Sequence, residues 1–133
     1  MGEWENVPAN VEDYYGFVYE IMNLITAKRY IGKKFYWRTE RKAPLKKSGK
    51  KRDRISRKET DWREYYGSCK ELTKDIEKYG KQNFRRVILN SYPTRFECAY
   101  YEIKTQIDQE VLFRPEYYNG IVNCRLRRPG KRG

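Results

Sequence analysis

Two tyrosines, two lysines and a glycine form a group whose types and spacing suit phosphate chemistry. Residues 16–23 alternate and are rich in β-branched and aromatic side chains, which predicts a strand. Residues 29–33 predict a second short strand, and the gap between the two is of turn length, so we expect a hairpin. Phenols and ammonium groups donate hydrogen bonds to phosphate oxygens, and a glycine lets the backbone come close to a ligand. An ordinary hairpin with its tyrosines in the core is the alternative. The group consists of Tyr19, Tyr30, Gly32, Lys33 and Lys34.

A single carboxylate on a predicted helix is the candidate metal ligand. Thr94 opens the helix with a capping-box pattern, and apolar residues then recur at helical spacing as far as Ile107. Glu102 lies close to this apolar line and directly follows two tyrosines. Its neighbours at four-residue spacing, Cys98 and Gln106, carry no positive charge that could pair with it. One carboxylate with water molecules is a normal arrangement for Mg²⁺, and a solvated surface glutamate is the alternative.

The other periodic segments predict the elements that must position these side chains. Residues 84–89 form an apolar run that is typical of a central strand. A second helix is predicted over 68–79, with a capping box at Ser68 and a stop at Gly80. A short helix is predicted over 35–41. The expected fold class is therefore α/β in the broad sense (α+β), with a small three-stranded antiparallel sheet flanked by helices.

The composition excludes several kinds of active site. The chain has 133 residues, which suits one domain, and it contains no histidine. Serine–histidine and cysteine–histidine nucleophiles and histidine zinc sites are therefore excluded, so a hydrolase must use tyrosine, carboxylate, lysine or metal-bound water. No stretch approaches the roughly 20 apolar residues of a membrane helix, and no signal-peptide pattern is present, so we expect a cytoplasmic protein that binds no membrane.

Positive charge is concentrated in two segments. The formal net charge is +12; residues 41–58 hold ten basic residues and one acid, and residues 125–133 hold five basic residues and no acid. Such segments commonly bind polyanions, and neither has the apolar face of a membrane-bound helix, so nucleic acid is the expected partner. The cations expected to contact it are Lys34, Lys42, Lys46, Lys47, Lys50, Lys51, Arg52, Arg54, Arg57, Lys58, Arg125, Arg127 and Arg128.

The tyrosine hairpin resembles the paired signature of the GIY-YIG nucleases. Residues 16–19 read G-F-V-Y, one residue longer than the first half of that signature, whereas Tyr30-Ile31-Gly32 matches the second half to the letter. The resemblance extends over residues 15–122. It implies a metal-dependent endonuclease that hydrolyses DNA phosphodiester bonds with Mg²⁺ or Mn²⁺.

The resemblance also assigns roles to hairpin and helix residues. It implies that Glu102 binds the metal ion. It implies that Tyr19 is the general base, with help from Lys33, and that Tyr30 bonds the attacking water or the scissile phosphate. The triplet Glu102-Ile103-Lys104 also matches the acidic-x-lysine motif of another class of metal nucleases, but that class carries it on a strand.

Two further family residues have candidates here. An arginine early in the first helix would stabilise charge on the phosphate, an effect on the order of 3 kcal/mol in such sites. Arg41 and Arg38 are both candidates, because they would share a face of the helix predicted over 35–41. Arg41 is preferred and Arg38 is the second candidate. Asn119 resembles an asparagine near the family's active site, although Asn-Gly is a hairpin turn in its own right.

The expected protein is an endonuclease with one nuclease domain, residues 15–124, that carries the basic segment 41–58 as an insertion loop. An acidic leader (1–14) and a basic tail (125–133) flank it. A non-catalytic basic nucleic-acid-binding module on the same fold is the alternative, and a structural or ribosome-associated protein is a third hypothesis. One active site cuts one strand, so a dimer on DNA is one route to a double-strand break. The free-standing arrangement resembles small phage nucleases, which would act in the cytoplasm of an infected bacterium.

Overall fold

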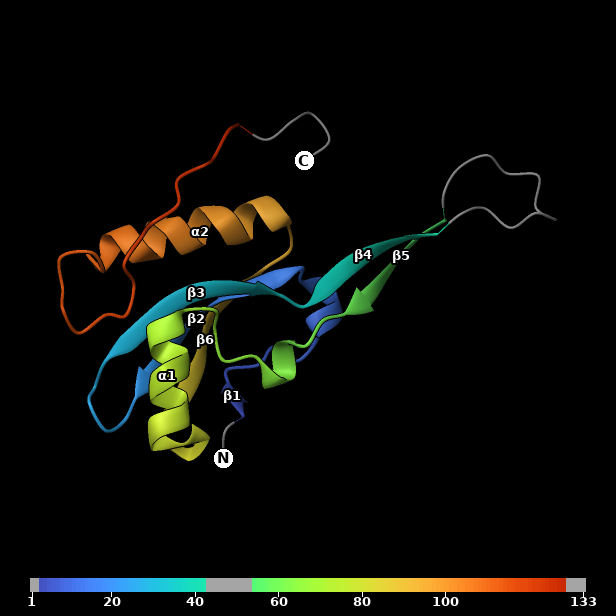
Figure 1. Cartoon of the computed structure of the whole chain (residues 1–133). Helices are drawn as coiled ribbons and strands as arrows, with labels where there is room; N and C mark the ends of the chain where they lie inside the picture. Colours follow the sequence, from blue (N-terminus) through green and yellow to red (C-terminus); the bar gives the residue numbers. More distant parts are fainter. Residues whose placement is uncertain (1–2, 43–53, 129–133) are drawn as a thin grey trace.

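A four-stranded sheet forms the centre of the molecule, with strand order β1-β6-β2-β3 (Figure 1). The structure, a computed structural model, describes residues 3–42 and 54–128. β2 pairs antiparallel with both β6 and β3, whereas β1 pairs parallel with β6. The strands are β1 (Trp4–Glu5), β2 (Gly16–Asn23), β3 (Arg29–Phe35) and β6 (Phe84–Tyr92).

The fourth strand, β1, corrects the prediction of a three-stranded antiparallel sheet. Trp4 is buried, its indole donates a hydrogen bond to the carbonyl of Trp62 at 2.7 Å, and its ring packs edge-on against Phe17 at 5.1 Å. Glu5 pairs with Arg85 on the neighbouring strand. A two-residue strand anchored by one tryptophan has no periodicity of its own, so only the tertiary contacts define it.

The two faces of the sheet are covered by different helices. α1 (Lys70–Tyr79) contributes Leu72 to a core that also contains Phe17 and Tyr19 of β2. α2 (Arg95–Asp108) packs against the opposite face of β2 and β3, where Cys98 lies beside Gly16. Side chains alternate between faces along a strand, so Tyr19 and Tyr30 lie on the α1 face and Lys33 lies on the α2 face.

The helix ends follow the sequence in part. Thr94 caps α2 as predicted, because its hydroxyl accepts a hydrogen bond from the Glu97 amide at 3.1 Å. Gly80 ends α1 with a φ of 89°, also as predicted. The capping box at Ser68 is wrong: α1 begins at Lys70. The short 3-10 helices are Val11–Asp13, Trp62–Glu64 and Lys81–Asn83.

The predicted helix over 35–41 is also wrong, since this part of the chain forms β4 (Trp37–Lys42). β4 pairs antiparallel with β5 (Arg54–Glu59), and the two strands form a ribbon that extends away from the sheet (Figure 1). Trp37 and Thr39 favour extended backbone, and a distant partner strand satisfies the backbone hydrogen bonds. The ends of the predicted basic loop are therefore strands, and its residues 43–53 lie outside the described residues. No helix in the described residues is long and apolar enough to cross a membrane.

Candidate active site

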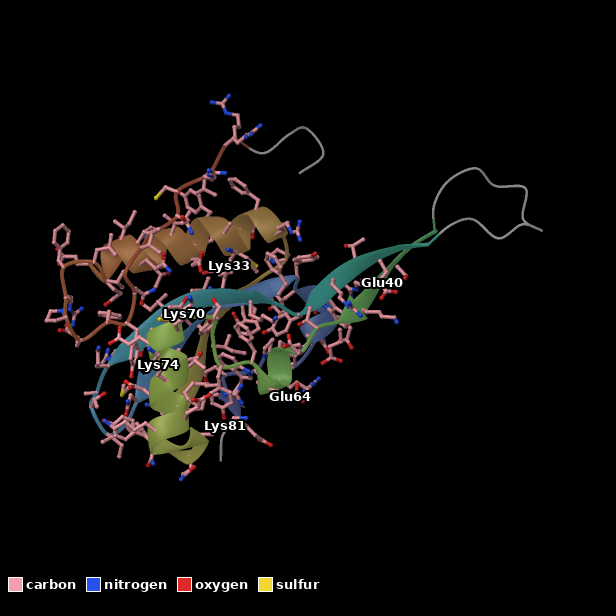
Figure 2. The ribbon with its side chains drawn as sticks, in the orientation of Figure 1. Lys33, Glu40, Glu64, Lys70, Lys74 and Lys81 are labelled. Carbon is pink, nitrogen blue, oxygen red and sulfur yellow. The ribbon has the colours of Figure 1, made fainter. Side chains whose placement is uncertain are left out.

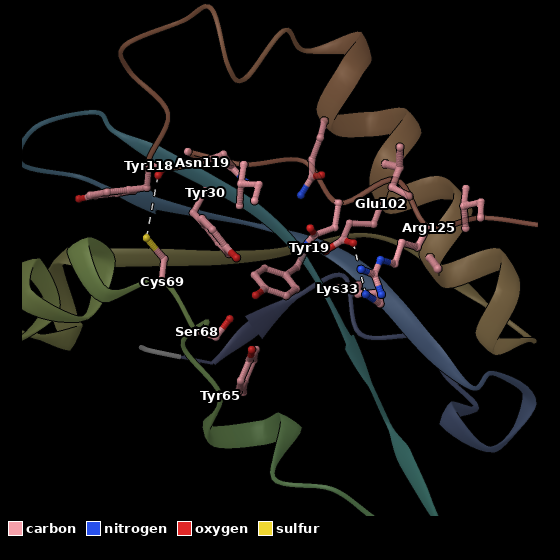
Figure 3. Close-up of a pocket in the computed structure, with 17 residues that line it drawn as sticks. Tyr19, Tyr30, Lys33, Tyr65, Ser68, Cys69, Glu102, Tyr118, Asn119 and Arg125 are labelled. Atoms are coloured by element: carbon pink, nitrogen blue, oxygen red, sulfur yellow. Dashed lines mark hydrogen bonds and ion pairs between the residues drawn. The ribbon is translucent and has the colours of Figure 1, made fainter.

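A cavity of about 770 Å³ lies at the β3 edge of the sheet, between α2 and the segment that leads into α1 (Figure 3). The predicted site residues that line it are Tyr19, Tyr30, Lys33, Glu102 and Asn119. They come from β2, β3, α2 and the chain after α2, so residues up to a hundred positions apart in sequence meet here.

Gly32 explains how residues from both faces of the sheet reach one cavity. β3 is an edge strand, and Gly32 lies directly opposite Tyr19 in the ladder. A Cβ atom at Gly32 would be 2.6 Å from the Tyr19 hydroxyl oxygen and 2.9 Å from the Tyr30 ring. The missing side chain therefore leaves space for the Tyr19 phenol to lie across β3, toward the edge where Lys33 and Glu102 approach from the other face.

Both phenols are held in their neutral form at neutral pH. Tyr19 is only 1% exposed, and burial raises its pKa well above the usual value, with Tyr65 and Tyr30 adding to the rise. Burial also raises the pKa of Tyr30, although a side-chain hydrogen bond with Ser68 offsets part of the effect. Ser68 thus bonds a cavity tyrosine instead of capping α1.

Glu102 meets Lys33 inside the cavity. The two charged groups are 3.4 Å apart, and the Glu102 side chain is 18% exposed. The cation therefore comes from β3, across the sheet edge, and not from the turns of α2 next to Glu102. Within the described residues no group of three metal-ligating side chains occurs. A lone carboxylate at a cavity fits Mg²⁺ or Mn²⁺, which accept hard oxygen ligands and keep bound water, better than it fits Zn²⁺.

Asn119 binds the backbone of the edge strand. Its side-chain oxygen accepts a hydrogen bond from the Ile31 amide at 3.0 Å, and its side-chain nitrogen donates to the Ile31 carbonyl at 2.8 Å. Gln106 of α2 donates to the same carbonyl at 2.9 Å. These bonds fix the backbone of β3 between Tyr30 and Gly32. Asn119 therefore positions the edge strand, and it is not a residue of a tight hairpin turn.

Comparison with known proteins identifies the family to which this chain belongs. Residues 3–122 match the family described as "Putative endonuclease segE, GIY-YIG domain". The chain belongs to the GIY-YIG family. It is 34% identical over 106 residues to the "Putative endonuclease segE" of Enterobacteria phage T4, and the match covers 79% of this chain and 40% of that protein. This GIY-YIG chain thus spans about two fifths of the length of that relative. No solved structure matches it.

The arginine that the resemblance led us to expect early in the first helix is not on α1. α1 contains no arginine. Arg38 lies on β4, exposed and 3.4 Å from Glu40, and it does not line the Tyr19 cavity. Arg41 pairs with Ile55 in the backbone ladder of β4 and β5, and its side chain lies outside the described part of the protein.

Tyr65 and Ser68 line the cavity of this GIY-YIG chain but were not predicted as site residues, whereas Arg125 was predicted only as a cation that contacts nucleic acid. Tyr65 and Ser68 approach the two phenols, and Arg125 lies in the irregular chain after Asn119. Figure 3 places Arg125 at the Glu102–Lys33 end of the cavity. Ser68 was interpreted as a helix cap, and Arg125 as a nucleic-acid-binding cation of the basic tail. In the sequence, the glycine directly before Ser68 was the signal of an unusual loop, and in the structure Gly67 has a φ of 87°.

Proposed function

We propose that this GIY-YIG protein is a metal-dependent endonuclease that hydrolyses phosphodiester bonds of DNA. The observation that carries the proposal is the convergence of two phenols, an ammonium group and a carboxylate on one cavity. A protein that only binds nucleic acid needs cations, but it does not need a buried and a partly buried tyrosine facing a carboxylate. Membership of the family supports the same reaction class.

Glu102 would hold Mg²⁺ or Mn²⁺ at the Lys33 end of the cavity. When bound, the ion supplies Lewis-acid stabilisation of negative charge on the phosphate and on the leaving oxygen. Lys33 orients the carboxylate and offers an ammonium donor to a phosphate oxygen. Tyr30, which is partly buried, donates a hydrogen bond to the attacking water or to the phosphate.

Tyr19 is proposed as the general base, acting from its phenolate form. Because burial raises the pKa of Tyr19, only a small fraction of the phenol is ionised at neutral pH. Below the pKa, the ionised fraction increases roughly tenfold with each unit by which the pH rises. The proposal therefore requires a cleavage rate that increases with pH from neutral to alkaline solution. In the neutral form the same hydroxyl donates a hydrogen bond and fixes the orientation of its neighbours.

The first test is nicking of supercoiled plasmid DNA. We expect nicked circles in the presence of Mg²⁺ or Mn²⁺, none in the presence of a chelator, and a faster reaction at higher pH. Binding of the same plasmid without any nicking would contradict the proposal and favour a non-catalytic binding module. Preference for RNA without cleavage would favour a ribosome-associated role.

Arg125 is proposed to supply the positive charge that the first helix lacks. Among the described residues it is the arginine that lines the cavity. A guanidinium at this place can donate two hydrogen bonds to a phosphate that gains charge in the transition state. Arg41 remains the other candidate from the sequence, whereas Arg38 faces a neighbouring cavity.

Replacing Arg125 with alanine tests this role. We expect cleavage to decrease by roughly a hundredfold, since loss of one such donor costs about 3 kcal/mol, with little change in the free energy of unfolding. Arg127→Ala is the matched control, because Arg127 is an exposed cation two residues further along the tail and outside the cavity. An equal loss in both variants would assign Arg125 to general DNA binding, and a selective loss in Arg41→Ala would assign the role to Arg41.

A further inference from the structure

A second cavity, of about 820 Å³, lies next to the proposed active site. It is bounded by the end of β3, the start of β4 and the first residue of α2. Of the residues that the structure describes, four cations and no carboxylate line this cavity, and the remaining lining residues are aromatic side chains and threonines. Lys33 lines both cavities, so they share one wall. The four cations are Lys33, Lys34, Arg38 and Arg95.

Arg95 is the cation that neither composition nor motif indicated. Its guanidinium lies over the ring of Phe35 at 5.1 Å and over the ring of Tyr15 at 5.8 Å. No carboxylate of the described residues lies within ion-pair distance of it. Rings on one side orient the guanidinium while its hydrogen-bond donors remain available to an anion, which is an arrangement suited to phosphate.

The other cations of this cavity are also restrained. Lys34 lies over the ring of Tyr65 at 4.2 Å and bonds Asp61, an exposed carboxylate, at 2.8 Å. Arg38 lies directly opposite Lys58 in the β4–β5 ladder, and both approach Glu40 at about 3.5 Å. The positive charge thus continues from the cavity onto one face of the ribbon.

We propose that this second cavity is a binding subsite for the DNA phosphates that flank the scissile phosphate. The proposal rests on the proposed function and adds the direction of the strand: the backbone runs from the Glu102 cavity past Lys33 and Arg95 toward the β4–β5 ribbon. Because Lys33 faces both cavities, one lysine bridges the reacting phosphate and its neighbour. Contacts of this kind fix the register of the duplex without reading its sequence.

The experiment is DNA binding as a function of salt, measured by fluorescence anisotropy with a fluorescein-labelled duplex and a chelator. The logarithm of the affinity falls with the logarithm of the salt concentration, and each lost phosphate contact makes this slope less steep by about 0.9. We expect the double variant Arg38→Ala/Arg95→Ala to make the slope less steep by about 1.8. We also expect it to bind the duplex roughly tenfold more weakly or worse. Lys74→Ala is the matched control, since Lys74 is an exposed lysine on α1, away from both cavities (Figure 2).

The outcomes separate this subsite from the catalytic proposal. The subsite is overturned if the double variant keeps the wild-type slope, or if Lys74→Ala makes the slope less steep by the same amount. This holds even if the wild-type protein nicks DNA. The subsite is supported if the slope becomes less steep in the double variant and not in Lys74→Ala. If the wild-type protein then fails to nick DNA, the catalytic proposal alone fails. Arg38→Lys/Arg95→Lys keeps both charges and is expected to retain the wild-type slope, which excludes loss of folding as the cause.

Discussion

Replacing Glu102 with alanine is expected to abolish Mg²⁺-dependent cleavage of DNA while leaving DNA binding nearly intact. Among the described residues Glu102 is the carboxylate that lines the cavity, so its loss removes the anchor for the ion. Metal stabilisation of the phosphate is worth several kcal/mol, so cleavage should decrease by at least about a thousandfold. The stability cost is small, because the ion pair with Lys33 is long at 3.4 Å and partly exposed. Cleavage is measured by single-turnover kinetics and binding by anisotropy.

Asp108→Asn is the control for this experiment. Asp108 is an exposed carboxylate on the same helix, paired with Lys104 and outside the cavity, so its removal should leave cleavage unchanged. Glu102→Gln keeps the size and polarity of the side chain and should fail like the alanine variant. Cleavage that persists in Glu102→Gln at near the wild-type rate would exclude Glu102 as the metal ligand.

Gly32→Ala is expected to destabilise the protein and to disable the cavity. The added Cβ would be 2.6 Å from the Tyr19 hydroxyl oxygen and 2.9 Å from the Tyr30 ring, and Tyr19 is fully packed and cannot rotate away. Overpacking of this kind costs about 1–3 kcal/mol, and here it displaces both proposed catalytic phenols. We expect a lower free energy of unfolding in urea and a loss of cleavage of more than about tenfold.

A double-mutant cycle with Tyr19→Phe tests the stated cause. Removing the hydroxyl relieves the shortest contact, so the double variant should be more stable than the sum of the two single effects by about 1 kcal/mol. Gly120→Ala is the matched control, because a Cβ at Gly120 meets no atom within 4 Å. Additive effects in the cycle would mean that Tyr19 does not occupy the space above Gly32.

Local patterns were sufficient for the elements that carry the site. Alternation defined β2, the apolar run defined β6, and the Thr94 cap defined the start of α2. Glu102 could therefore be placed on the correct helix, and the hairpin tyrosines on adjacent strands. Each of these features depends on residues close in sequence, where periodicity and capping chemistry have a direct physical meaning.

The features that the sequence did not indicate depend on distant partners. β4 is a strand because β5 pairs with it, and β1 exists because Trp4 enters the core and bonds Trp62, which is 58 positions away. The helix predicted over 35–41 failed for this reason, since Trp37 and Thr39 form a strand once a partner is present. The Lys33–Glu102 pair and the location of Arg125 likewise arise only when α2 and the chain after it close over the edge of β3.

The amide of Asn119 has a consequence for the behaviour of the protein at high concentration. An open sheet edge is a template on which another chain can add a strand and start an aggregate. At Ile31 this template is already occupied, because a side chain imitates the missing strand by using both the amide and the carbonyl. On the opposite side of the sheet, the two residues of β1 pair with Arg86 and Val87 of β6. Strand addition to β3 is therefore blocked at Ile31, even though four strands lie in one open layer.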